Sequence, residues 1–222
     1  MSAPVGVLGG TFDPIHFAHL RLAHEAWERL GLDHVRLVPS ATPPHRALPG
    51  VSAEHRLAMV QRAVADHPGL RADGRELDRT GPSYTIDTLE GLRAELPPAT
   101  PLCLILGADA FLLLTTWKRW EALFDQAHLV VAHRPGHPPD RWTAGMEPAL
   151  RRAFELRLTT GISDLRTSAS GRIYALGITQ LDISSTAIRT AIAAGRSPRY
   201  LLPPNVIDYI GLQQLYKDPD AR

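Results

Sequence analysis

The chain has 222 residues, of which 44% are hydrophobic, enough for one large α/β domain with a packed core. Its formal net charge of +1 at pH 7 creates no strong basic field, which argues against nucleic acid or a membrane surface as a partner. A single cysteine, Cys103, excludes an intrachain disulfide, and its apolar surroundings predict a buried strand residue rather than a nucleophile. We see no signal peptide and no apolar run long enough to span a bilayer, so we expect a cytoplasmic protein.

Apolar runs that predict strands alternate along the chain with amphipathic stretches that predict helices. The strands are expected at residues 5–8, 34–38, 70–77, 102–106, 128–133 and 172–176. The helices are expected at residues 18–30, 53–66, 86–96, 151–158, 186–194 and, after Pro203-Pro204, in the segment that runs to residue 216. This alternation predicts an α/β fold with a doubly wound parallel sheet. We take residues 1–222 as a single domain, with about 184–216 as a small C-terminal helical extension.

A glycine turn that joins the first strand to the first helix is the most informative stretch of the sequence. It reads Gly9-Gly10-Thr11-Phe12-Asp13-Pro14-Ile15-His16-Phe17-Ala18-His19. Such a turn can bind a phosphate chain, because glycines permit close approach and a helix N-terminus offers free N–H groups. His16 and His19 share a helix face, where two imidazoles could bond a triphosphate. The turn is neither a Walker A loop nor a GxGxxG fingerprint. The alternative to phosphate binding is an ordinary connecting turn between a strand and a helix.

Residues 183–189 form a second candidate phosphate site near the C-terminal end. Ser184, Ser185 and Thr186 are expected at a helix start, and Arg189, one turn later, can offer its guanidinium to phosphate oxygens. Taken alone, this pattern also fits a capping series followed by a solvated arginine. Together with the glycine turn it favours phosphate binding, because separate segments with the same chemistry then converge on one site.

Two further loops follow predicted strands and should reach the same edge of the sheet, where open α/β sheets bind ligands. Asp109, just after Gly107, could bond ribose hydroxyls, cap the following helix, or do both. His45 and Arg46 could receive a mononucleotide phosphate or belong to an exposed basic loop. The other histidines are expected on the surface or in packing, and the sequence has no Cys/His cluster with zinc spacing.

The motifs of this chain resemble those of the nucleotidylyltransferases. Residues 9–19 are similar to the family signature GGTFDPxHxGH, with Ala18 where the signature usually has glycine, and residues 183–189 are similar to ISSTxIR. Further segments resemble the bacterial nicotinate-nucleotide adenylyltransferases: Pro43-Pro44-His45-Arg46, Pro82-Ser83-Tyr84-Thr85, Gly107-Ala108-Asp109 and Trp117. The resemblance extends from residue 5 to about residue 216. It implies a Rossmann-like fold.

The resemblance also implies a set of site residues. ATP would bind at Gly9, Gly10, Thr11, Phe12, His16, His19, Gly107, Asp109, Arg134, Ile183, Ser184, Ser185 and Arg189. Nicotinate mononucleotide would bind at His45, Tyr84, Thr85 and Trp117. Thr85 heads a predicted helix whose N–H groups suit a carboxylate, and Trp117 offers a stacking face, whereas Trp120 is expected in the core. His16, His19 and Arg189 would be catalytic, no residue would be a metal ligand, and Mg²⁺ would arrive on ATP.

The reaction that the resemblance implies is adenylyl transfer from ATP to nicotinate mononucleotide, which forms deamido-NAD and pyrophosphate in NAD biosynthesis. The acceptor phosphate is ionised at neutral pH, so the transfer needs positioning and charge stabilisation but no general base. Three alternatives stay open: a different phosphorylated acceptor such as nicotinamide mononucleotide, a non-catalytic nucleotide-binding module, and a synthetase-like ligase fragment. The expected partners are these small molecules, with a homo-oligomer as an open question.

Overall fold

The computed structural model describes residues 2–42, 49–134 and 142–217, and within them a parallel sheet forms the centre of the molecule. The sheet has seven strands in the order β3-β2-β1-β4-β5-β7-β6, and every neighbouring pair is parallel. In chain order the strands are β1 (Val5–Gly10), β2 (His34–Pro39), β3 (Leu70–Ala72), β4 (Leu102–Gly107), β5 (His128–His133), β6 (Leu158–Thr159) and β7 (Ile173–Gly177).

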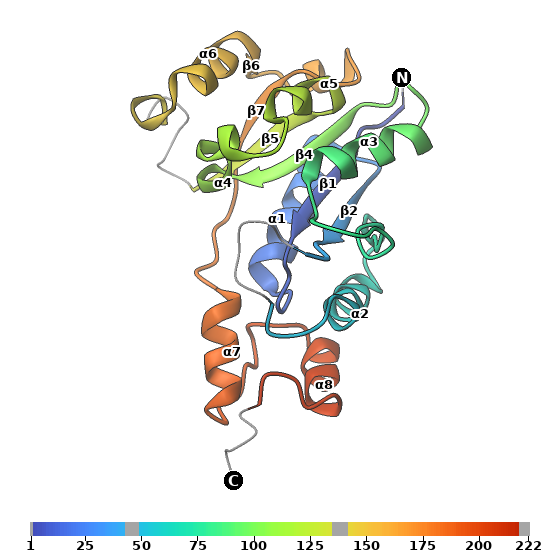
Figure 1. Cartoon of the computed structure of the whole chain (residues 1–222), viewed down its shortest axis with the longest axis vertical. Coiled ribbons are helices and arrows are strands. Elements are labelled where there is room, and N and C mark those ends of the chain that lie inside the picture. The colour runs from blue at the N-terminus through green and yellow to red at the C-terminus, as the bar shows by residue number, and fades with distance from the viewer. Residues whose placement is uncertain (1, 43–48, 135–141, 218–222) are drawn as a thin grey trace.

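Helices flank the sheet and extend the molecule at one end. They are α1 (Phe17–Leu30), α2 (Ala53–Val64), α3 (Thr85–Glu95), α4 (Ala108–Leu112), α5 (Leu123–Gln126), α6 (Pro148–Arg157), α7 (Ser185–Ala193) and α8 (Pro204–Leu212). Figure 1 shows α7 and α8 at the end that carries the C-terminus, away from the N-terminus. The prediction of a doubly wound parallel α/β fold is confirmed.

The predicted elements differ from the observed ones in a few places. The third strand ends at Ala72 rather than at residue 77, because the chain turns at Gly74, where the Leu77 N–H donates to the Gly74 carbonyl. Strand β6 was not expected, and neither were α4 and α5. Each has five residues or fewer, which is too short to show a period in the sequence.

Alternating side chains of the central strands enter two separate apolar cores. In β4, Leu104 joins the core beneath α3 and α6, while Cys103 and Ile105 join the core beneath α1 and α2. Because both faces are covered, the strand reads in sequence as an unbroken apolar run. Cys103 is 0% exposed, and burial raises the pKa of its thiol to about 12, which confirms it as an inert strand residue.

The C-terminal segment shares the core of the sheet. Ile188 of α7 and Val206 and Ile210 of α8 are buried in the same cluster as the apolar faces of α1 and α2. Helices α2 and α8 also meet through a hydrogen bond in which the Asn205 Nδ2 donates to the Arg62 carbonyl at 2.7 Å. The residues after α7 are therefore packed against the sheet domain by apolar burial.

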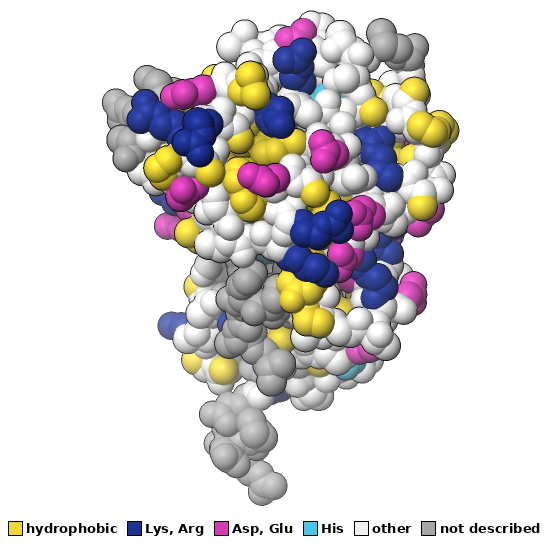
Figure 2. All heavy atoms as spheres, turned by 45° about the horizontal axis from the view of Figure 1, so that its top comes forward, with side chains coloured by type: hydrophobic (Ala, Val, Ile, Leu, Met, Phe, Trp, Pro, Cys, Tyr) yellow, Lys and Arg dark blue, Asp and Glu magenta, His cyan; other side chains and the backbone are white. Residues whose placement is uncertain are grey.

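Acidic and basic side chains lie interspersed with apolar ones over the face shown in Figure 2. This distribution agrees with the small net charge of the chain. In the described part of the chain, no helix is long and apolar enough to cross a membrane.

The Leu104→Ala substitution is expected to lower the free energy of unfolding by about 3 kcal/mol, because it leaves a cavity in the apolar core beneath α3 and α6. Leu104 is 3% exposed, whereas Leu156 on α6 is 76% exposed and serves as the matched control. Leu156→Ala should change the free energy by less than about 0.5 kcal/mol. Urea unfolding followed by circular dichroism measures both, and equal effects of the two substitutions would contradict the assignment of Leu104 to the core.

Candidate active site

The order of the strands reverses between β1 and β4, and several of the predicted site residues lie at the strand ends beside that point. Strands β2 and β3 extend to one side of β1, and β4, β5, β7 and β6 extend to the other. Leu8 pairs with Ile105, so Gly10 at the end of β1 lies beside Gly107 at the end of β4. Arg134 follows β5 at the same edge, because Gly107 pairs with Ala132. Open parallel sheets bind ligands in the crevice that such a reversal creates.

The glycine turn after β1 has a geometry that its residues explain. Phe12 adopts a left-handed backbone conformation, with φ of 50°, and its ring is buried. A Cβ atom on Gly10 would lie 2.9 Å from that ring, so the close approach of chain and ring requires glycine. A Cβ built on the exposed Gly9 would meet no atom within 4 Å among the described residues beyond its own chain neighbours. Gly9 and the half-buried Thr11 thus present backbone that a ligand can approach.

The predicted histidine pair is formed at the start of α1. The His16 and His19 rings are stacked, with centroids 3.7 Å apart and an interplanar angle of 23°. The His16 backbone N–H donates to the His19 Nδ1 at 3.4 Å, and the Phe12 ring meets His19 edge-on. The two imidazoles therefore form one unit at the N-terminus of a helix.

His16 is the more buried member of this pair, at 4% exposed. Burial lowers the pKa of its imidazole to about 4, so the ring is neutral at pH 7. In the described part of the chain its Nδ1 has no hydrogen-bond partner. Buried polar atoms are rarely left without a partner, so this nitrogen marks a place that a ligand could fill.

The second predicted phosphate segment contacts the first directly. Helix α7 begins at Ser185, and Ser184 is its N-cap, with its side chain accepting from the Ala187 N–H. The Ser185 Oγ donates to the Pro14 carbonyl at 3.0 Å. The Arg189 Nη1 donates to the Asp13 carbonyl at 2.7 Å. Two segments more than 170 positions apart in sequence thus form one surface.

The residues expected near the adenosine lie at the sheet edge but are less enclosed. Gly107 is the N-cap of α4, and Asp109 lies exposed in the first turn of that helix. The alternative that Asp109 itself caps the helix is therefore wrong. Arg134 is exposed just beyond β5. Ile183 is half-buried and packs against the core, and it also lines an apolar hollow of about 420 Å³ with Phe17.

The residues expected at the acceptor end approach one another through a charged side chain. Helix α3 begins at Thr85, one residue earlier than predicted, with Tyr84 as its N-cap. The Lys118 Nζ lies 4.3 Å above the Tyr84 ring and 3.3 Å from the Asp87 carboxylate. Because Lys118 is adjacent to Trp117, these contacts tie the Trp117 loop to the start of α3.

Trp117 and His45 are the other residues expected at the acceptor end. Trp117 and Trp120 are both half-buried against the same core, and Trp120 meets the Phe124 ring edge-on. Burial alone therefore does not separate the two tryptophans. His45 lies outside the described residues.

Arg56 is a residue of this region that the sequence reasoning missed. It is 1% exposed, and its Nη1 donates to the carbonyls of Thr11 at 2.8 Å and Ser40 at 2.6 Å, while its Nη2 donates to Ala41 at 3.1 Å. Arg56 thus joins the loops that follow β1 and β2. The signal was present in the sequence, since Arg56 shares the apolar face of α2 with Met59 and Val60.

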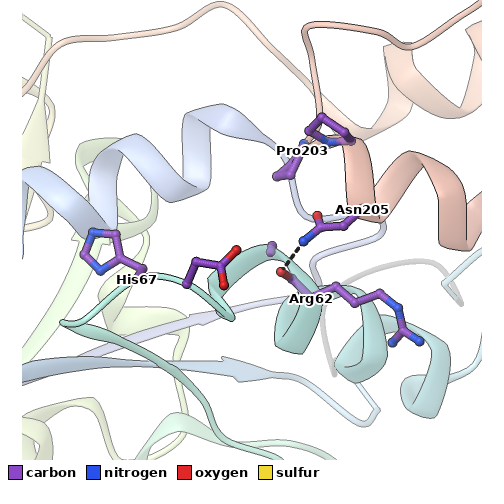
Figure 3. A pocket seen from close by; sticks show the side chains of 7 residues that line it. Arg62, His67, Pro203 and Asn205 are labelled. Carbon is purple, nitrogen blue, oxygen red and sulfur yellow. Dashed lines mark hydrogen bonds between the residues drawn. The ribbon is translucent and has the colours of Figure 1, made fainter.

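A cavity of about 470 Å³ lies apart from these residues, between α2 and the start of α8. Figure 3 shows Arg62, His67, Pro203 and Asn205 around it. Its lining includes none of the predicted site residues. The predicted site residues at the strand ends therefore lie outside this cavity.

The parallel sheet carries the histidine-bearing glycine turn at its reversal point, and this turn contacts the serine-rich helix start. Residues 7–191 match the family model described as cytidylyltransferase-like. Curated relatives named probable nicotinate-nucleotide adenylyltransferase are similar over nearly the whole chain. The protein of Aeromonas salmonicida is 50% identical, covering 98% of this chain and 99% of its own, and that of Dechloromonas aromatica is 46% identical, covering 98% and 100%.

The chain belongs to the nicotinate-nucleotide adenylyltransferase family of nucleotidyltransferase enzymes. A solved structure of the Plasmodium falciparum nicotinic acid mononucleotide adenylyltransferase, complexed with NaAD, has the same fold. Its TM-score is 0.69 at 18% identity, covering 97% of this chain and 98% of that one.

The His16→Gln variant is expected to lose less stability than the parent between about pH 7 and about pH 5. The folded protein keeps His16 neutral down to a pKa of about 4, whereas the unfolded chain protonates this imidazole below its ordinary value of 6.5. The contribution of His16 is thus complete above pH 6.5 and is lost as the pH falls toward 4. Urea unfolding at both pH values measures it, with His24→Gln on the same helix as the control. Equal losses in parent and His16→Gln would show that His16 is not held as a neutral buried imidazole.

Proposed function

We propose that this chain transfers the adenylyl group of ATP to nicotinate mononucleotide, forming deamido-NAD and pyrophosphate. The observation that carries the proposal is the direct contact between the two phosphate-binding segments. Ser185 and Arg189 bond the backbone of Asp13 and Pro14, within a few residues of the stacked histidines. N–H and hydroxyl donors from both segments can then surround a single triphosphate.

In this mechanism the chain positions two anions and stabilises the charge that moves between them. An oxygen of the acceptor phosphate forms a bond to the α-phosphorus of ATP. The bond between the α-phosphorus and the oxygen that links it to the β-phosphate breaks, and its electron pair leaves with pyrophosphate. The acceptor phosphate is already ionised at pH 7, and no proton has to be removed. His16, neutral at that pH, would act as a hydrogen-bonding group rather than as a cation, with His19 beside it. Arg189 would hold the departing pyrophosphate.

The remaining residues would divide between the two substrates. Backbone groups of residues 9–12, together with Ser184 and Ser185, suit the phosphates. Gly107, Asp109, Arg134 and Ile183 would bind toward the adenosine, and Tyr84, Thr85, Trp117 and His45 toward nicotinate mononucleotide. The helix start at Thr85 supports the choice of an acid, because free N–H groups and the helix dipole favour a carboxylate.

Mg²⁺ is best treated as part of the nucleotide substrate. Among the described residues, no group of three or more His, Cys, Asp or Glu side chains gathers in a way that could hold a metal ion. The Asp13 carboxylate beside the phosphate segments already accepts from the Gly50 N–H and the Tyr216 hydroxyl. A Mg²⁺ ion carried by phosphate oxygens and water fits this donor set, and it would offset the charge of the triphosphate. We place the reaction in the cytoplasm.

The His19→Ala variant is expected to lower kcat at least about a hundredfold, because it removes a group that acts on charge in the transition state. The matched control is His24→Ala, five residues further along α1, whose imidazole bonds His67 rather than the histidine pair. That variant should keep a rate within about twofold of the parent. Pyrophosphate release in the presence of ATP and nicotinate mononucleotide measures both, after circular dichroism has confirmed the fold. A near-normal rate for His19→Ala would overturn the assignment.

Paired assays with nicotinate and nicotinamide mononucleotide test the choice of acceptor. We expect kcat/KM to favour the acid by at least about tenfold, since about 1.4 kcal/mol from a charge-assisted bond suffices. Preference for the amide would favour the alternative acceptor, and absence of pyrophosphate with either would favour a non-catalytic nucleotide-binding module.

The tryptophan assigned to the acceptor can be tested in the same assay. Trp117→Ala should raise the KM for the acceptor by about tenfold while leaving the KM for ATP unchanged. Trp120→Ala, which removes a ring of similar burial, should change neither.

A further inference from the structure

The Asp13 carboxylate is the centre of a buried network beside the histidine pair. Asp13 is 4% exposed. Its Oδ1 accepts from the Tyr216 hydroxyl at 2.7 Å, and its Oδ2 accepts from the Gly50 N–H, also at 2.7 Å. The glycine turn is thereby joined to the stretch before α2 and to the segment that follows α8.

Arg189 hydrogen-bonds the backbone carbonyl of Asp13 and forms only a long ion pair with the carboxylate. Its Nη1 donates to the Asp13 carbonyl at 2.7 Å, while the same nitrogen lies 3.6 Å from the Asp13 Oδ2. Its Nη2 makes a long contact of 3.4 Å to the Thr186 Oγ1. The Arg189 side chain is 33% exposed, and a guanidinium has five N–H donors, so this arrangement leaves donors for a ligand.

The four residues of this network are packed closely enough that a change in one affects the others. A Cβ atom on Gly50 would lie 3.4 Å from each of the Arg189 Cδ, the Asp13 Oδ2 and the Tyr216 Cε1. Gly50 therefore lies at the point where the three side chains meet. Rotation of the Asp13 carboxylate would alter its contacts with all of them.

We propose that Tyr216 is a positioning residue for ATP binding: its hydroxyl keeps the Asp13 carboxylate from closing its 3.6 Å ion pair with Arg189 into a two-pronged hydrogen-bonded pair, and so leaves the guanidinium available to phosphate. The inference rests on the proposed role of Arg189. Opposite charges at this separation attract, and a two-pronged pair between guanidinium and carboxylate is the geometry they favour. The Tyr216 hydroxyl and the Gly50 N–H each occupy one carboxylate oxygen and oppose that pairing.

The state of Tyr216 supports this role. Its backbone is left-handed, with φ of 62°, which is unfavourable for a residue with a Cβ atom and persists only where the surroundings fix it. Burial, together with the neighbouring Asp13 carboxylate, raises the pKa of the Tyr216 hydroxyl. The hydroxyl therefore keeps its proton and remains a donor to Asp13.

The test compares ATP binding to the parent, to Tyr216→Phe and to Tyr209→Phe by titration calorimetry without acceptor. Loss of the Tyr216 hydroxyl should let the carboxylate pair with Arg189 and weaken ATP binding at least about fivefold. Tyr209 is the matched control, because its hydroxyl also belongs to the C-terminal segment but bonds His55 at 2.8 Å. Its variant should bind ATP as the parent does. Equal affinity in parent and Tyr216→Phe, or equal weakening in the two variants, would overturn the proposal.

A second arm separates positioning from simple anchoring of the chain end. In the Asp13→Asn background the side chain at position 13 carries no charge to pair with Arg189, so adding Tyr216→Phe should cost no further ATP affinity. A further loss there would show that Tyr216 acts only by anchoring the chain end. The same comparison applies if Tyr216→Phe alone fails to fold, because the double variant leaves no buried charge unpaired. A parent that binds no ATP would instead refute the proposed function itself.

Discussion

The contact between the glycine turn and the C-terminal segment is the interaction on which the candidate site depends. The turn after β1 exposes backbone at a sheet edge, but by itself it has no cation. Asp13 supplies the connection, because its buried carboxylate accepts from Gly50 and Tyr216 while its carbonyl accepts from Arg189. Apolar side chains of α7 and α8 are buried in the same core as those of α1, which stabilises this contact. The arginine is thus held at the glycine turn by apolar packing as well as by its hydrogen bond to the Asp13 carbonyl.

Burial decides how the charges of this region can act. His16 is neutral at pH 7 and adds no positive charge to the proposed phosphate site, whereas Arg189 and the helix N-termini do. Arg56 is a second buried cation, but it bonds backbone carbonyls and serves to hold the loops after β1 and β2 together. A site built in this way holds its donors in place before the ligand arrives, which is the arrangement that favours stabilisation of a moving charge.

The two halves of the proposed site differ in the contacts that hold their residues in place. The phosphate half is joined by hydrogen bonds between distant segments, and its residues are mostly buried or half-buried. The half expected to bind the acceptor consists of a helix start at Thr85 and a loop at Trp117, linked through Lys118.

The sequence alone was sufficient to predict the fold, because unbroken apolar runs alternating with amphipathic stretches are local features that indicate a parallel sheet. The glycine turn and the serine-rich helix start, also local features, predicted two candidate phosphate segments, and the structure brings these segments into contact. Tertiary structure decided what depends on distant contacts: the neutrality of His16, the burial of Arg56 and the bonds from Tyr216 and Arg189 to Asp13. It also showed that Asp109 does not cap its helix and that β6 completes the sheet. The partners of these side chains are set by elements far away in the chain, so no local pattern of residues could reveal them, although the place of Arg56 on the apolar face of α2 was visible in the sequence.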